Sequence, residues 1–110
     1  MNGDGEKNCY EIAGRLIGTL RNSTFLCNGY IYSTKLKRYI RHAWVEDDRS
    51  VWDYSNNRRL ILPKVDYYRE GKINGIVQRY SRLEALEMIK STGKFEFWNQ
   101  DVRQKILGDK

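Results

Sequence analysis

The chain has 110 residues, 40 % of them hydrophobic, which is enough for one folded domain with a modest core and argues against disorder. Its net charge of +6 comes from basic residues spread along the chain, so a solvated basic surface is the simplest interpretation. No segment approaches the ~20 apolar residues of a membrane helix, and the start of the chain lacks a signal-peptide core. We therefore expect a cytoplasmic protein that does not enter a membrane and keeps its two cysteines as free thiols.

The first half of the chain predicts one helix followed by an antiparallel meander. Residues 1–7 are polar and glycine-rich and are expected to form a loose tail. A helix is expected from about Cys9 to Arg21, capped by Asn8 together with Glu11, because apolar side chains recur at helical spacing. Strands are expected at Phe25–Ser33, Arg38–Glu46, Val51–Tyr54 and Leu60–Leu62, with turns at 47–50 and Asn56-Asn57. The links are too short for helical crossovers, which favours antiparallel pairing.

The second half predicts shorter elements. The expected elements are a helix that Pro63 opens and Gly71 ends, a strand at Ile76–Tyr80, a helix at 82–92 closed by Gly93, and a terminal helix capped by Asn99. Ser81 and Glu84 have the spacing of a capping box ahead of the helix at 82–92. The chain is thus expected to be a single α+β domain spanning residues 1–110. Its N-terminal helix packs on an antiparallel sheet, and further helices follow at the C-terminus.

A cysteine, the only histidine and an aspartate occur in an order that thiol enzymes use. Cys9 opens the predicted helix, where free N–H groups and the helix dipole favour a negatively charged thiolate. A hairpin at 47–50 places Trp44 opposite Asp53, so that Asp53 lies diagonal to His42 on one face of the sheet. In this arrangement Cys9 attacks an acyl carbon, His42 carries the proton and Asp53 orients the imidazole ring.

Each of these residues also has a structural interpretation. A buried cysteine is most often a small core residue, and a lone histidine in a strand is more often structural than catalytic. Asp53 would then simply end a strand. Cys27 is an alternative nucleophile, but a thiol in the middle of a strand lacks the activation that a helix end provides. No metal site or cofactor is expected, because one histidine and two cysteines lack the paired short spacing of zinc sites.

The sequence around these residues resembles the transglutaminase-like superfamily, within the wider group of papain-like cysteine enzymes. The resemblance covers about residues 8–54 and is carried by Asn8-Cys9-Tyr10, by Leu26–Ile31, and by His42–Glu46 with Trp52-Asp53. It implies that Cys9 is the nucleophile, His42 the general base and acid, and Asp53 the orienting carboxylate. The implied substrate contains an amide or peptide bond, and the outcome is hydrolysis, deamidation or acyl transfer. The family usually has a proline soon after the aspartate, where this chain has Tyr54.

Three further questions stay open at this point. The backbone N–H of Cys9 is one candidate for the oxyanion hole, and Asn28 and Trp44 are candidates for its second donor. One alternative function is a nucleic-acid-binding module that uses the basic and aromatic stretches 37–41 and 78–82. Another is a catalytically inactive domain of the same fold that binds a protein partner. The oligomeric state cannot be read from the sequence.

Overall fold

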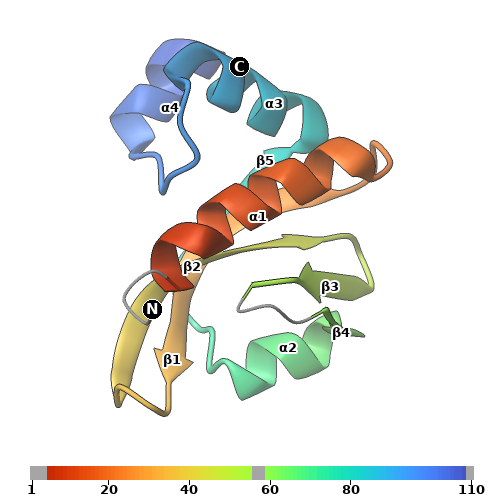
Figure 1. Ribbon diagram of the computed structural model, residues 1–110, viewed down its shortest axis with the longest axis vertical. Helices are drawn as coiled ribbons and strands as arrows, with labels where there is room; N and C mark the ends of the chain where they lie inside the picture. Colours follow the sequence, from red (N-terminus) through yellow and green to blue (C-terminus); the bar gives the residue numbers. More distant parts are fainter. Residues whose placement is uncertain (1–4, 56–58, 109–110) are drawn as a thin grey trace.

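The computed structural model describes the backbone of residues 5–55 and 59–108, and side chains from residue 9 onward in these ranges. This part of the chain is an α+β domain with four helices and a five-stranded antiparallel sheet in the order β4-β3-β2-β1-β5 (Figure 1). The elements are α1 (Gly5–Thr19), β1 (Phe25–Ser33), β2 (Arg38–Glu46), β3 (Ser50–Asp53), β4 (Leu60–Pro63), α2 (Lys64–Glu70), β5 (Gln78–Ser81), α3 (Arg82–Thr92) and α4 (Gln100–Leu107). None of the described helices is long and apolar enough to cross a membrane.

The sheet has the predicted meander and the predicted register at the β2–β3 turn. Strands β3 and β2 pair at Trp52 with Val45 and at Val51 with Glu46. The Asp47 carboxylate accepts hydrogen bonds from the backbone N–H groups of residues 49 and 50, at 2.9 and 2.7 Å. These bonds close the turn and fix the register, which decides the face on which each later side chain of β3 lies.

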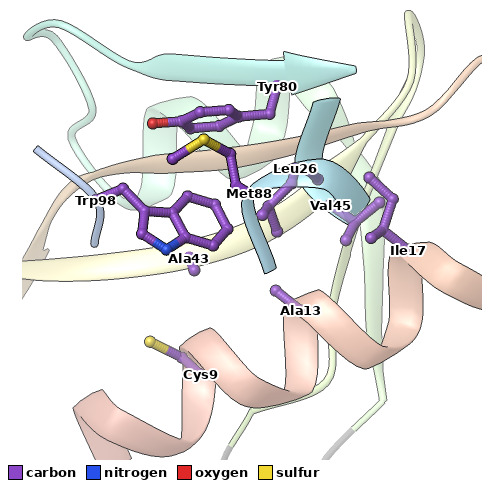
Figure 2. Packing of buried hydrophobic residues seen from close by; sticks show 10 residues of the cluster. Cys9, Ala13, Ile17, Leu26, Ala43, Val45, Tyr80, Met88 and Trp98 are labelled. Carbon is purple, nitrogen blue, oxygen red and sulfur yellow. The ribbon is translucent and has the colours of Figure 1, made fainter. Parts of the chain in front are cut away.

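Two hydrophobic clusters lie on opposite faces of the sheet, because side chains alternate along each strand. Along β2, Ala43 and Val45 belong to the cluster that also contains the buried side of α1, with Cys9, and residues of α3 (Figure 2). Trp44, between them, belongs to the second cluster, which contains Tyr67 of α2. β2 therefore contributes buried side chains to both layers at once.

The ends of α1 differ from the prediction. The helix begins at Gly5, so residues 5–7, expected in a loose tail, are helical, and Asn8 lies within the helix instead of capping it. The Glu11 carboxylate accepts a hydrogen bond from Arg15, and takes no part in the predicted cap. The helix ends at Thr19, earlier than predicted, and Arg82 donates to the backbone carbonyls of residues 17 and 18 there. The remaining tail positions 1–4 and the turn predicted at 56–57 lie outside the described residues.

The predicted caps of the last two helices are confirmed. Ser81 and Glu84 form a reciprocal capping box, with the Ser81 hydroxyl accepting from the Glu84 N–H at 3.2 Å. Gly93 closes α3 in the left-handed conformation, with a φ of 68°. The Asn99 side chain accepts from the N–H of Val102 at 2.9 Å and caps α4. Pro63 differs slightly from its prediction, because it ends β4 and precedes the first residue of α2.

The segment 93–99, which joins α3 to α4, packs against α1. A Cβ added at Gly14 would lie 2.5 Å from a ring carbon of Phe95, so the close approach of this segment requires a residue without a side chain. At Gly18, one turn further along, the nearest atom to an added Cβ is Leu86 Cδ2, at an ordinary 4.0 Å. The two helical glycines thus face different constraints.

Gly14→Ala should therefore destabilise the fold, while Gly18→Ala should not. Overpacking against Phe95 is expected to cost about 1–3 kcal/mol of the free energy of unfolding, only partly offset by the better helix propensity of alanine. Gly18→Ala gains that propensity, about 0.5–1 kcal/mol, without the clash. Urea unfolding of both variants measures the difference, and equal effects would contradict the packing described here.

Candidate active site

His42 and Asp53 form a buried pair at the centre of the site. The His42 Nε2 atom lies 2.9 Å from Asp53 Oδ2, and the two side chains are only 6 % and 2 % exposed. Asp53 also accepts hydrogen bonds from the Tyr67 hydroxyl at 2.7 Å, the Ser55 hydroxyl at 2.6 Å and the Ser55 N–H at 3.2 Å. Burial opposes the charged form of Asp53. The hydrogen bond and charge of His42, together with the hydroxyl bonds, outweigh it and hold the pKa of Asp53 well below its ordinary value.

The second partner of His42 is the thiol of Cys9, which is hydrogen-bonded to the imidazole ring. Because Nε2 faces Asp53, Nδ1 is the ring nitrogen left for the sulfur. Burial lowers the pKa of His42, but the hydrogen bonds and electrostatic interactions with Asp53 and Cys9 outweigh burial and raise it from 6.5 to about 9. At neutral pH the ring is thus an imidazolium placed between a carboxylate and a sulfur.

Three elements that are separate in the sequence bring this group together. His42 lies beyond the last β2–β3 pair, Val45 with Trp52, so β3 does not pair with β2 at this position. Asp53 reaches His42 from the end of β3, on the face that the register predicts. Cys9 reaches it from α1, and all three predicted site residues therefore meet. Their catalytic role remains a prediction.

The position of Cys9 within α1 differs from the prediction. Because the helix starts at Gly5, Cys9 lies in the second turn, and α-helical pairing directs its N–H to the carbonyl of Gly5. The effect of the helix dipole falls off after the first turn. The Cys9 N–H is consequently not the free oxyanion donor that a helix start at residue 9 predicts.

The other two sequence candidates are occupied elsewhere. Cys27 lies in the cluster on the opposite face, and burial, followed by the negative charge of Glu46, raises the pKa of its thiol well above the ordinary value. This makes Cys27 a poor nucleophile near neutral pH. The indole N–H of Trp44 donates to Glu46 at 3.0 Å, so it does not serve as an oxyanion donor.

Sequence reasoning missed the residues that surround the carboxylates. The contact of Ser55 with Asp53 could have been predicted, because a serine two positions after an aspartate often closes a turn on the carboxylate. Nothing in the sequence links Tyr67 to Asp53. Sequence reasoning also missed that Glu46 is a buried acceptor. The Glu46 carboxylate is paired with Lys64 at 2.9 Å and Arg79 at 3.0 Å, and it accepts the Tyr68 hydroxyl at 2.7 Å.

The contacts of residues 78–82 bear on the nucleic-acid alternative. Arg79 is paired with Glu46, Tyr80 is buried, and Arg82 donates to carbonyls of α1. These three side chains therefore make contacts within the fold, although the Arg79 side chain remains 42 % exposed. The other basic stretch, 37–41, is mostly exposed, but it alone offers only a small surface. No group of three or more metal-ligating side chains occurs among the described residues.

Stability should fall as the pH rises from about 6 to about 9. In the folded protein His42 keeps its proton up to its pKa of about 9, whereas in the unfolded chain it releases the proton above a pKa of 6.5. The stabilisation that this proton provides is therefore complete below pH 6.5 and is lost as the pH rises to about 9. His42→Gln, which cannot titrate, should show a much flatter profile over the same range. Urea unfolding at several pH values measures both proteins. An equally steep decline in the variant would mean that His42 does not carry this protonation.

Comparison with known proteins does not assign the chain to a family. No family model, no curated protein and no solved structure matches it. Its function has to be inferred from the site itself, in which a buried imidazolium lies between a thiol and a fully hydrogen-bonded carboxylate.

Proposed function

We propose that this protein is a cysteine-dependent acyl-transfer enzyme with a papain-like, transglutaminase-like core. Cys9 is the nucleophile, His42 the proton carrier and Asp53 the carboxylate that orients it. The observation that carries the proposal is the His42 ring, bonded to Asp53 on one side and to the Cys9 thiol on the other. A histidine that only stabilised the fold would need a carboxylate partner such as Asp53, but it would not need a hydrogen bond to a thiol such as that of Cys9.

The chemistry follows from this arrangement. The Cys9 sulfur attacks the carbonyl carbon of an amide as a thiolate whose proton is held by His42, and the imidazolium gives that proton to the departing nitrogen as the carbon–nitrogen bond breaks. The product is a thioester on Cys9 and a free amine. Water or a second amine then attacks the thioester, and His42 takes the proton of that nucleophile while the Cys9 thiolate leaves, which restores the thiolate–imidazolium pair. Hydrolysis and transfer differ only in this last nucleophile.

Asp53 has the role of a positioning residue in this scheme. Its hydrogen bond to Nε2 fixes the ring so that Nδ1 faces the sulfur, and its charge stabilises the imidazolium. Tyr67 and Ser55 hold the carboxylate in turn, so its two oxygens cannot rotate away from His42. This support from two further residues is typical of a site held in one geometry.

The thiol is covered in the described form. Cys9 is 1 % exposed, and Trp98 of the segment 93–99 belongs to the cluster that buries it (Figure 2). Phe97 of the same segment packs edge-on against Tyr10 and tilted against Tyr30, with ring centroids 6.4 and 5.7 Å apart. The sulfur is therefore closed off from solvent in this form, and an acyl donor has to enter between α1 and the segment 93–99.

The burial of Cys9 is also the observation that favours the competing proposal, an inactive domain of the same fold that binds a protein partner. In that case the thiol is a core residue and the segment 93–99 stays in place. The two proposals differ in whether the thiol of the folded protein reacts under the control of His42.

Alkylation by iodoacetamide over a range of pH values separates these proposals. Below pH 7, Cys9 should react faster than Cys27, because Cys9 is hydrogen-bonded to His42 whereas burial raises the pKa of the Cys27 thiol, and His42→Asn should slow the reaction at Cys9. Peptide mass spectrometry of the folded protein assigns the label to each cysteine. Cys27→Ala is the matched control and should leave the rate at Cys9 unchanged. A Cys9 rate that equals that of Cys27 and ignores His42 would refute the enzyme proposal.

A further inference from the structure

Two buried N–H donors have no hydrogen-bond partner within the described part of the chain. They are Nδ2 of Asn28 and the indole Nε1 of Trp98, whose residues are 1 % and 2 % exposed. A buried donor without a partner costs about 1–3 kcal/mol, and such groups are rare in folded proteins. Both therefore call for an acceptor that is absent from the resting fold.

Asn28 faces the layer that contains Cys9. It lies two residues after Leu26 on the same face of β1 and directly opposite Ala43 of β2, and cross-strand partners share a face. Leu26 and Ala43 belong to the same buried cluster as Cys9. The Asn28 amide is thus on the α1 side of the sheet, opposite Ala43, the residue that follows His42 along β2.

Trp98 approaches the same layer from the segment 93–99. Figure 2 shows its indole between Tyr80 and Cys9, with the nitrogen on the edge of the ring nearer to Cys9. The ring is held edge-on against Tyr80, with centroids 5.2 Å apart and planes at 76°. The orientation of its N–H group is consequently fixed by packing.

We infer that Asn28 and Trp98 supply the oxyanion hole of the proposed enzyme, an inference that rests on the function proposed above. As the Cys9 sulfur bonds to the carbonyl carbon, the π electron pair of the carbonyl moves onto its oxygen. The negatively charged oxygen then accepts one hydrogen bond from the Asn28 amide and one from the Trp98 indole. Donors fixed in a site without water stabilise such a charge strongly. The other candidates are engaged, since the Trp44 N–H donates to Glu46 and the Cys9 N–H lies within α1.

The test replaces each donor by an apolar group of similar shape, in Asn28→Leu and Trp98→Phe. The readout is the burst of p-nitrophenolate from p-nitrophenyl acetate in a single turnover, with Cys9→Ala as the blank. Each variant should lose about 10²-fold in acylation rate. The rate of iodoacetamide alkylation at Cys9 should stay within about twofold of the parent, because alkylation forms no oxyanion. Stability should not fall for Asn28→Leu, since an unpaired donor has been removed.

Gln78→Leu is the matched control. Gln78 lies opposite Asn28 on β5, but its amide already donates to Gln100 at 2.8 Å. This variant should leave acylation unchanged. Unchanged acylation in Asn28→Leu and Trp98→Phe would overturn the inference while leaving the enzyme proposal intact. A parent protein without a Cys9-dependent burst would overturn both.

Discussion

The burial of five consecutive residues of β2, 42–46, is the constraint on which the rest of the structure depends. Ala43 and Val45 fill the layer beneath α1, so the three larger residues between and beside them must be accommodated on the other face. Two of these, His42 and Glu46, carry charge, and a buried charge is tolerated only with partners. Much of the remaining chain supplies those partners.

The two charged residues are satisfied in different ways. Glu46 is paired with Lys64 of α2 and Arg79 of β5, which ties both elements to the central strand. His42 takes a carboxylate and a thiol and stays protonated. The first arrangement neutralises a carboxylate with fixed cations. The second places a proton between two groups that can exchange it. The proposed function rests on the second arrangement.

The sequence predicted the elements well where local rules decide them. The strands β1 and β2, the capping box of α3 and the register at 47–50 follow from alternation and turn chemistry, and the meeting of His42 with Asp53 follows from that register. The start of α1 was mispredicted, because residues 5–7 show no apolar pattern that marks a helix. This shift moves Cys9 into the second turn of α1, so its backbone N–H is no longer a candidate oxyanion donor.

What the sequence could not provide are contacts between distant segments. The hydrogen bond from Tyr67 to Asp53 and the ion pair of Arg79 with Glu46 depend on how α2 and β5 pack against the rest of the sheet. No local sequence pattern encodes that packing. The same holds for the burial of Cys9 by residues of the segment 93–99. A periodic helix predicts that its apolar face is covered, but not by which part of the chain.

The cover over Cys9 has a consequence for the order in which the chain acquires its structure. The thiol and Trp98, which helps to bury it, lie almost at opposite ends of the sequence. A chain emerging from its N-terminus can form α1 and the β1–β2 hairpin long before residues 93–99 exist to pack on them. Until then the sulfur is open to any oxidant or electrophile it meets. Its burial is completed only when the segment 93–99 has packed onto α1, so the exposure of this one atom reports whether that segment has docked.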